Sequence, residues 1–495
     1  KQFMQLHSEI CQSFSQVTLD SEKAENRRTY PAFQLPLPLA PRLLMPKRLI
    51  NRIKNLFTGK PMAAAGPRII PASEHSFPAS DVSIGARRVI ETLADAGYEA
   101  YLVGGSIRDG LMGVHPKDFD IATNATPEQI RQVFRSCRLI GRRFRLAHVR
   151  IGREILEVAT FRGHHQQGVE DVEEESADGK VSVSDAGLIL RDNVFGTIQE
   201  DAIRRDFTAN ALFYRLSDGA IIDYVGGYDD ILARRLRLIG DPETRFREDP
   251  VRILRAVRFA AKLDFTIDAS LADPIRNLGN LLDHVPAARL FEEIQKLFIS
   301  GYATPVWQKL AEFGLESHLF PVLKDLSDEE RAMIAFAMRN TDARLAQDKP
   351  VTPAFLLAVL LWPPLKKEWE RLKAQEIHPV PAFQQAAQTV INIQNQQVSI
   401  PKRFQIPMRE IWDLQVRLPR RQGKRADQCL EHPRFRAAYD FLLLREEAGE
   451  TEAGLGQWWT RYQEADEGTR RSMITQLDAP AGQAPRKGRR RGRKD

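Results

Sequence analysis

The fold is decided by residues 98–123, which read YEAYLVGGSIRDGLMGVHPKDFDIAT. Residues 100–103 form an apolar run typical of a strand. Gly104 and Gly105 then predict a turn, because residues without a Cβ enter strained backbone conformations at low cost. Residues 106–111 can begin a short helix. The stretch therefore predicts a strand, a turn and a helix that place backbone amides at one point.

Two acidic residues follow the turn and the helix. Alternate residues of a strand share a face, so Asp118 and Asp120 would point one way while Phe119 and Ile121 enter a core. Their Cα atoms would lie about 6.6 Å apart, a spacing at which two carboxylates can share divalent metal. Backbone amides at a turn and helix start can hold phosphate. A lone Asp-x-Asp is usually incidental, but its combination with this turn predicts phosphoryl or nucleotidyl transfer.

Composition indicates a protein of several domains. The 495 residues suffice for two to four domains, and a hydrophobic content of 43% allows real cores. No apolar run approaches the eighteen residues of a membrane span, and no secretory signal peptide is present. The three cysteines are far apart and form no metal-spaced pair. We therefore expect a reduced, cytoplasmic protein.

Positive charge is concentrated at the two ends of the chain. The net charge is +7, yet residues 486–495 carry seven Lys or Arg against one Asp, and residues 1–80 carry eleven against five acids. The remaining residues, 81–485, therefore have a net charge of −5. Basic arms of this kind usually serve a polyanion such as RNA.

The N-terminal extension, residues 1–80, lacks sustained periodicity and is predicted to be largely disordered. Residues 1–44 can be leader sequence instead of native chain, because Met45 opens a more protein-like stretch. Residues 46–59, PKRLINRIKNLFTG, predict a basic amphipathic helix suited to a peripheral contact with an anionic membrane, or to RNA. A helix docked on the rest of the protein explains the pattern equally well. At the other end, residues 478–495 predict a disordered Arg-rich tail.

The segment around the two aspartates predicts a small mixed sheet. A helix with Asp81 as its cap precedes it, and Thr126 caps a second helix with Pro127 in the first turn. Strand-like runs follow at 146–151 and 154–161. A Rossmann fold is excluded because its Gly-x-Gly-x-x-Gly motif is absent.

An acidic segment and a charged helix come next. Residues 163–187 are poor in apolar side chains and predict a mobile loop near the site, or a plain surface insertion. Residues 200–210, EDAIRRDFTAN, predict a helix in which Asp201 and Arg205 pair. Arg204 and Arg205 can bind triphosphate. Asp206 is placed to join the metal carboxylates or to fix the arginines; an ordinary charged helix is the alternative.

Residues 248–263 predict a strong helix that carries an arginine at every third position. Asp249 and Arg252 flank its first turn and can offer an acceptor and a donor to the edge of a nucleotide base. The alternative is a row of charged side chains on the exposed surface of a helix. Residues 264–395 continue the helical pattern.

Residues 400–446 combine cations with aromatic side chains. Lys and Arg side chains could follow an RNA backbone while Phe404, Trp412 and Phe435 stack bases. A basic pair of helices without this function is equally common. The residues that we expect to bind RNA are Arg420, Arg421, Lys424 and Arg425.

These motifs resemble the class II nucleotidyltransferases, which include CCA-adding enzymes and bacterial poly(A) polymerases. LVGGSIRDGLMG…KDFDIAT resembles the family signature, and EDAIRRDFTAN and EDPVR resemble further motifs in the right order. LIGRRFRLAHV, residues 139–149, is similar to the element that marks bacterial poly(A) polymerases, as are the basic 400–446 region and the tail. The resemblance covers residues 81–300 best.

The resemblance implies a fold and a site. It implies an α+β fold: a small mixed-sheet nucleotidyltransferase head (81–240), an all-helical neck that recognises the base (241–310), a helical body (311–477) and the disordered basic tail. The metal ligands for two Mg²⁺ (or Mn²⁺) would be Asp118 and Asp120, and the third catalytic acid would be Asp206, with Glu157 as a rival. The nucleotide-binding residues would be Gly104, Gly105, Ser106, Arg108, Arg204, Arg205, Asp249 and Arg252.

The implied function is addition of AMP from ATP to RNA 3′ ends, which promotes RNA decay in bacteria. The implied partners are ATP, RNA 3′ ends and RNA-decay proteins, and the chain is expected to be a monomer. Two alternatives remain open, namely CCA addition to tRNA and an inactive RNA-binding protein.

Overall fold

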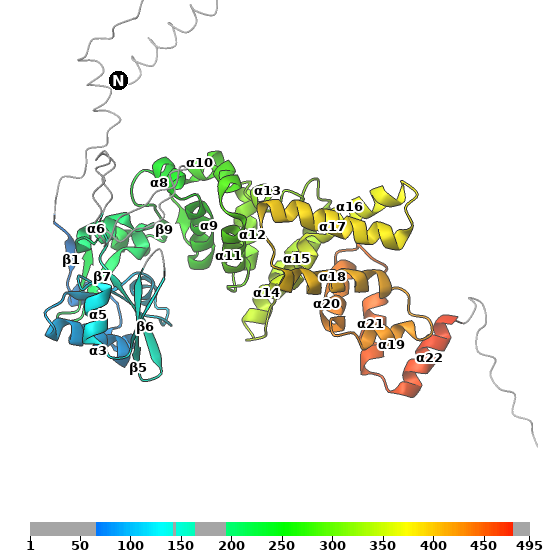
Figure 1. Ribbon diagram of the computed structural model, residues 1–495, viewed down its shortest axis with the longest axis horizontal. Helices are drawn as coiled ribbons and strands as arrows, with labels where there is room; N and C mark the ends of the chain where they lie inside the picture. Colours follow the sequence, from blue (N-terminus) through cyan, green and yellow to red (C-terminus); the bar gives the residue numbers. More distant parts are fainter. Residues whose placement is uncertain (1–65, 142–144, 164–194, 479–495) are drawn as a thin grey trace, which may run out of the picture. The chain divides into compact units, whose positions relative to one another are not determined.

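A computed structural model describes residues 66–141, 145–163 and 195–478 (Figure 1). These residues belong to one compact unit that begins at Gly66. Four predictions lie outside the described residues: the extension up to residue 65 with its basic helix 46–59, almost all of the acidic loop 163–187, residues 142–144 of the LIGRRFRLAHV element, and the tail from residue 479.

Eight strands of the described chain form one mixed sheet in the order β1-β8-β7-β2-β3-β6-β5-β4. The expected mixed-sheet head followed by helices is confirmed (Figure 1). A separate parallel pair joins β9 (Arg235–Leu236) to β10 (Thr266–Ile267). The strands of the sheet are β1 Arg68–Ile70, β2 Ala100–Val103, β3 Asp120–Thr123, β4 Cys137–Ile140, β5 Leu146–Ile151, β6 Glu154–Thr160, β7 Leu212–Arg215 and β8 Ala220–Asp223.

Helices account for most of the rest of the described chain. Among the residues described, none of the helices has both the length and the apolar character that a membrane crossing requires. The helices are α3 Ile84–Asp95, α4 Gly105–Leu111, α5 Pro127–Val133, α6 Ile198–Arg204, α7 Gly227–Leu232, α8 Pro242–Glu248, α9 Val251–Leu263, α10 Ala269–Asn277, α11 Ala287–Phe298, α12 Ala303–Glu312, α13 Glu316–Leu319, α14 Asp328–Leu345, α15 Pro353–Leu360, α16 Trp362–Lys373, α17 Pro379–Gln397, α18 Lys402–Arg417, α19 Arg425–Leu430, α20 Phe435–Glu447, α21 Leu455–Glu464 and α22 Glu467–Asp478, with short 3₁₀ turns at Ala72–Glu74, Ala79–Asp81, Thr208–Asn210 and Gly279–His284.

The strands β3 and β6, next to the centre of the sheet, pair in parallel, and every other pairing within the described sheet is antiparallel. Parallel strands need a crossover connection, and α5 with β4 and β5 provides it here. Ile121 and Val158 are register partners in this pair, and both are buried. The same register sets Asp120 opposite Glu157.

Helices cover both faces of the sheet. On one face α3 contacts β2 and β6, and α5 contacts β4 and β5. On the other face Ala202 of α6 joins an apolar cluster with Val103 and Phe213. The cap of α3 is Ser83, whose hydroxyl accepts a hydrogen bond from the Ala86 amide, so the prediction of Asp81 as cap is wrong. The prediction for α5 is confirmed, because the side chain of Thr126 caps that helix.

The long helix expected at 248–263 begins later than predicted. α8 ends at Glu248, and Asp249 has an extended backbone (φ −150°, ψ 93°) before α9 starts at Val251. The cause is Pro250, whose ring disfavours a helical conformation in the residue before it. Because of this break, Asp249 does not share the regular helical spacing of the arginines on α9. α9 then packs against α11 and α12.

Candidate active site

The two predicted metal ligands lie at the start of β3. Asp118 precedes the strand and Asp120 is its first residue, so only Asp120 has the strand position that was expected for both. Both side chains are exposed, whereas Phe119 and Ile121 are buried as predicted. The alternation therefore delivers two carboxylates to the surface beside an apolar core.

Two other carboxylates lie close enough to Asp120 to affect its charge. Although its side chain is exposed, the neighbouring groups partly desolvate the Asp120 carboxylate and raise its pKa. The charges of Glu157 and Asp118 raise this pKa further, while Arg205 opposes them. Glu157 projects from β6, where His148 of β5 lies 3.3 Å from its carboxylate. A divalent cation would relieve this repulsion, which is the chemistry expected of a metal site.

The described residues contain no ready-made cluster of three or more metal-binding side chains. This finding is compatible with Mg²⁺, which is usually bound by one or two carboxylates together with substrate phosphates and water. Asp118 and Asp120 therefore fit the ion as a pair. Their role as metal ligands stays a prediction.

The glycine turn has the conformation that its sequence predicts. Gly104 has φ +80° and precedes the first turn of α4, which begins at Gly105. Ser106 is buried, and its hydroxyl has no hydrogen-bond partner among the described residues. A small donor held next to the first amide of a helix suits a phosphate oxygen.

Arg108 lies in α4 and faces the protein interior. Its side chain is 4% exposed and pairs with Asp109 at 2.6 Å. It also donates a hydrogen bond to the side-chain oxygen of Asn210. The guanidinium is thus held in place behind the glycine turn, and its interaction with a phosphate stays a prediction.

The helix predicted over residues 200–210 ends at Arg204. The predicted ion pair is present, with Arg205 Nη2 2.7 Å from Asp201 Oδ2. Arg205 also lies over the ring of Phe213 at 5.3 Å and lowers the pKa of Asp120. Arg205 is therefore close to the carboxylates, and Arg204 is the last residue of α6.

Asp206 has a different environment from the other two aspartates. Its carboxylate pairs with Arg255 of α9, with Arg255 Nε 2.8 Å away, and accepts a hydrogen bond from the Phe207 amide. Burial alone would raise the pKa of Asp206, but Arg255, the Phe207 amide and Asn210 hold it below its ordinary value. The sequence left Asp206 either to join the metal carboxylates or to fix Arg204 and Arg205, whereas the arginine that it holds here is Arg255 of α9.

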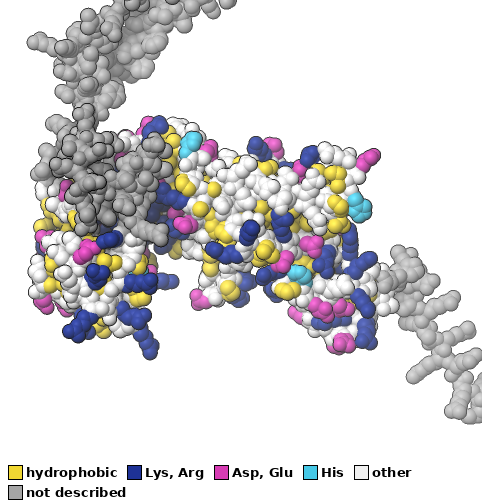
Figure 2. Space-filling model, viewed as in Figure 1, with side chains coloured by type: hydrophobic (Ala, Val, Ile, Leu, Met, Phe, Trp, Pro, Cys, Tyr) yellow, Lys and Arg dark blue, Asp and Glu magenta, His cyan; other side chains and the backbone are white. Residues whose placement is uncertain are grey.

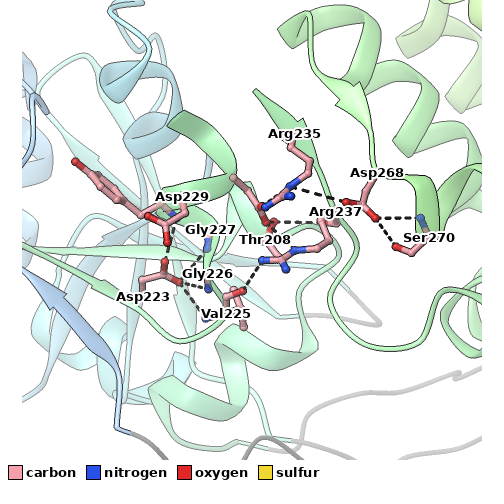
Figure 3. Close-up of polar contacts among 12 residues, drawn as sticks. Thr208, Asp223, Val225, Gly226, Gly227, Asp229, Arg235, Arg237, Asp268 and Ser270 are labelled. Carbon is pink, nitrogen blue, oxygen red and sulfur yellow. Dashed lines mark hydrogen bonds and ion pairs between the residues drawn. The ribbon is translucent and has the colours of Figure 1, made fainter. Parts of the chain in front are cut away.

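A buried polar network holds the segment after Asp206. The Thr208 hydroxyl donates to Asp230 Oδ2 at 2.6 Å, and Asp230 is fully buried between Arg235 and Arg237. Figure 3 shows both arginines reaching toward Thr208, with Asp268 beside Arg235. This network was not predicted from the sequence, because its members lie near residues 208, 230–237 and 268 and no periodic pattern links these segments.

Asp223 anchors the turn that leads into α7. Its carboxylate accepts hydrogen bonds from the amides of Val225, Gly226, Gly227 and Tyr228 at 2.8–3.1 Å (Figure 3). A Cβ on Gly227 would lie 2.1 Å from the Thr208 carbonyl oxygen, so only glycine fits there. The turn and the Thr208 segment are thereby packed against each other.

The two predicted base-recognition residues are each paired within the protein. Asp249 Oδ2 lies 2.9 Å from Arg289 Nη2 of α11. Arg252 Nη1 lies 2.9 Å from Glu248 and donates to the Arg245 carbonyl oxygen at 2.8 Å. Both residues thus lie in one polar cluster on α8, α9 and α11, in which Arg245 and Arg289 were not predicted.

The residues expected to bind RNA lie in the turn between α18 and α19 and at the first residue of α19. Arg420, Lys424 and Arg425 are exposed, so their cations are open to a phosphate backbone. Arg421 lies 5.1 Å over the ring of Trp458. The binding of RNA by these four residues stays a prediction.

The aromatic side chains of the same region do not form the predicted stacking surface. Trp412 and Phe435 are buried in the cores of the helices and cannot face a base, so the prediction of stacking on them is wrong. Phe404 is partly buried, and its ring centroid lies 5.6 Å from that of Phe291. The apolar spacing that places these rings among cations serves the packing of α18 and α20.

A second group of exposed cations lies on the sheet. Arg138 on β4, Arg150 on β5 and Arg153 in the following turn are all exposed. Figure 2 shows Lys and Arg side chains gathered at this end of the molecule, around β5 and β6. The charge of this strand edge was not predicted.

Three protein-family models match the chain. Residues 100–237 match the "Poly A polymerase head domain", residues 264–326 the "Probable RNA and SrmB- binding site of polymerase A", and residues 375–494 the "Polymerase A arginine-rich C-terminus". Together they cover strands β2 to β10, the helices α4 to α7 and α10 to α13 and the helices from α17 onward, and they leave out β1, α3, α8, α9 and α14 to α16.

Known proteins match at two levels. Poly(A) polymerase I of Salmonella typhimurium is 48% identical over 86% of this chain and 92% of its own length. A CCA-adding enzyme of Lactobacillus helveticus is 37% identical over 46% of this chain and 53% of its own length. The crystal structure of the Bacillus stearothermophilus CCA-adding enzyme in complex with CTP has a TM-score of 0.51 at 25% identity, and the match covers 80% of this chain and 82% of that one.

Proposed function

The chain belongs to the poly(A) polymerase I family of class II nucleotidyltransferases, and from this membership we propose that it adds AMP from ATP to RNA 3′ ends without a template. The observation that carries the proposal is the 48% identity over 92% of a poly(A) polymerase I. The CCA-adding relative matches only about half of the chain. Likeness beyond the shared catalytic part therefore favours polyadenylation over CCA addition.

In this proposal Asp118 and Asp120 hold Mg²⁺ (or Mn²⁺), which would lower the pKa of the RNA 3′-hydroxyl and neutralise the departing pyrophosphate. Glu157 is the acid close enough to interact with this pair, because its charge adds to the rise in the pKa of Asp120. We therefore prefer Glu157 to Asp206 as the third carboxylate of the metal site. No covalent intermediate with the protein is required.

The triphosphate would lie over the glycine turn. The Gly104 amide already donates to the Leu212 carbonyl oxygen at 3.3 Å. The amide of Gly105 and the hydroxyl of Ser106, which has no partner among the described residues, would offer hydrogen bonds to phosphate oxygens. Arg205 supplies positive charge next to the carboxylates, and Arg108 supplies it from behind the turn. Positioning and electrostatics of this kind account for most of the catalysis of phosphoryl transfer.

Asp206 acts in this scheme through Arg255. The pair joins the segment after α6 to α9, the helix that begins beside Asp249 and Arg252. The base would be read by Asp249 and Arg252, which their partners Arg289 and Glu248 hold in fixed positions. Asp206 is thus a positioning residue that sets the phosphate site relative to the base site.

The test is to incubate the protein and RNA with each NTP separately. Long tails formed from ATP alone on generic RNA support the proposal, and the Asp118→Asn variant is the control that should make none. CTP use restricted to tRNA would instead identify a CCA-adding enzyme. RNA binding without any release of pyrophosphate would identify an inactive RNA-binding protein.

The remaining expectations extend the proposal. We propose ATP and RNA 3′ ends as substrates, RNA-decay proteins as partners, a monomeric state and a cytoplasmic location. A peripheral membrane contact through residues 46–59 stays a prediction. The cysteines described, Cys137 and Cys429, are both free, which is compatible with a reducing compartment.

A further inference from the structure

A cavity of about 530 Å³ lies among the helices of the predicted body. It forms where the end of α14, the turn after it and the start of α15 meet α20 (Figure 1). Its volume is within the range of about 300–1,000 Å³ typical of ligand pockets. None of its residues belongs to the active site, so its purpose is not explained by catalysis.

The cavity is positively charged. Four cationic side chains line it: Arg344 and Lys349 from one wall, and Arg434 and Arg436 from the other. An anionic ligand therefore meets cations on two sides, and Arg434 also pairs with Glu410 Oε2 at 2.9 Å.

Two acids also line the cavity, and each is close to a cation. Asp440 Oδ1 lies 3.0 Å from Arg436, and Glu447 lies 4.0 Å from Arg339 outside the cavity. The lining keeps a net excess of two positive charges. The acids thus reduce the attraction for an anion without reversing it.

The floor of the cavity is apolar. Leu444 is buried and Phe355 is partly exposed, and Val351 completes this surface. Asn340 and Gln347 add exposed side-chain amides, which can both donate and accept hydrogen bonds. An aromatic ring, apolar neighbours, amides and cations together match the chemistry of a nucleotide, because bases stack on aromatic rings and cations bind phosphate.

We propose that this cavity binds one nucleotide of a single-stranded RNA chain, with the base on the Phe355 side and the phosphates at the cationic walls. The inference rests on the proposed function and adds an RNA contact to it. The α20 wall belongs to the segment that matches the arginine-rich C-terminus model, but the α14–α15 wall lies outside every matched segment. An acidic peptide would satisfy the cations and leave the aromatic and amide groups unused.

The first experiment compares two double variants that each remove two cations. Lys349→Gln with Arg436→Gln alters the cavity at exposed positions. Arg371→Gln with Lys373→Gln is the matched control on α16, where both cations pair with acids as Arg436 does. Binding of a labelled oligoadenylate to the full chain is measured against salt.

The cavity variant should bind the oligoadenylate about tenfold more weakly at low salt, and its salt slope should fall by about 0.7 for each phosphate that is no longer bound. The control should keep the affinity and slope of the unchanged protein. Equal affinities and equal slopes for the two variants would overturn the proposal. An acidic peptide that displaces the oligoadenylate from the unchanged protein and loses affinity in the cavity variant would also overturn it.

The second experiment locates the RNA on the unchanged protein. An oligoadenylate with one photoreactive adenine should crosslink to peptides from residues 340–355 and 433–447. Crosslinks confined to other peptides would overturn the proposal. Loss of these crosslinks on adding 5′-AMP at the concentration of the oligoadenylate would show a free-nucleotide site and overturn the commitment to RNA.

A third measurement separates this inference from the proposed function. AMP transfer to a short RNA is followed with the same preparations. If the unchanged protein transfers no AMP, the proposed function fails whatever the binding data show. If transfer is normal and the KM for RNA is the same in the cavity variant and the control, only the cavity proposal fails.

Discussion

Replacing Asp206 by Asn tests whether this residue acts through Arg255 or through metal. The substitution keeps the shape of the side chain and removes the charge that pairs with Arg255. Removing one partner of a buried ion pair costs about 3–5 kcal/mol. Because the side chains here are 13% and 34% exposed, we expect the lower part of that range, about 3 kcal/mol of unfolding free energy.

The pH dependence follows from the lowered pKa of Asp206. A carboxylate whose folded pKa is depressed stabilises the protein above its unfolded pKa of about 3.9, and this contribution is lost as the pH falls through the folded pKa. The difference in unfolding free energy between the unchanged protein and Asp206→Asn should therefore be constant near neutral pH. It should shrink as the pH falls below about 4.

A double-mutant cycle with Arg255→Gln isolates the pair. The single and double variants should show a coupling of about 1.5–3 kcal/mol in urea unfolding, as expected for hydrogen bonds to charged groups. Loss of AMP transfer should be similar in all three variants, and the Mg²⁺ concentration for half-maximal activity should not change. Asp218→Asn is the control, since its pair with Arg215 is exposed and should contribute less than about 1 kcal/mol.

The reasoning would be refuted by the opposite pattern. If Asp206→Asn unfolds like the unchanged protein, needs much more Mg²⁺ and shows no coupling to Arg255, then Asp206 is a metal ligand. Glu157→Gln should show the raised Mg²⁺ requirement in its place.

Asp118→Asn or Asp120→Asn should abolish AMP transfer while RNA affinity stays nearly unchanged. A variant whose rate stays within about tenfold of the unchanged protein, which is about 1.4 kcal/mol of activation free energy, would contradict the assignment of these residues as metal ligands. Arg252→Ala should raise the KM for ATP or weaken discrimination against CTP, as measured by kcat/KM for the four NTPs; four unchanged values would exclude it from the base site. Asp223→Ala should lower the unfolding free energy in urea by about 3 kcal/mol or more, because four backbone amides lose their acceptor, and a loss below about 1 kcal/mol would contradict this role. Deleting residues 486–495 should weaken RNA binding at low salt and flatten its salt dependence, by about 0.7 in slope for each phosphate that the tail no longer binds; identical slopes would assign that tail another partner.

Local patterns were predictable where a single segment decides the structure. The strand at 100–103, the positive φ of Gly104 and the cap at Thr126 all follow from residues within a few positions of each other. The end of α6 at Arg204 could not be predicted from the neighbouring residues in the sequence. Residues 205–210 have acceptable helical spacing, but pairing of Asp206 with Arg255 and of Thr208 with Asp230 provides a better use of their polar groups.

Partners on distant elements explain the other misses. Trp412 looks like a stacking residue beside cations, yet its indole donates to the Ala358 carbonyl oxygen inside the helical core. Arg289 lies 40 residues from Asp249, and no periodic pattern links them. A sequence shows which residue types can pair, but only the packing of helices decides which of them meet.

The register of β3 and β6 has a consequence for insertions and deletions. Asp120 and Glu157 meet because they are partners across two strands, so the length of chain between the strands is not what sets their distance. Loops in that interval can lengthen or shorten without moving either carboxylate. A single residue inserted between Glu154 and Glu157 would instead turn Glu157 to the opposite face and present an apolar neighbour to Asp120. Length variants made by gene shuffling should therefore survive in the turns around β4 and β5 and be inactive within β6.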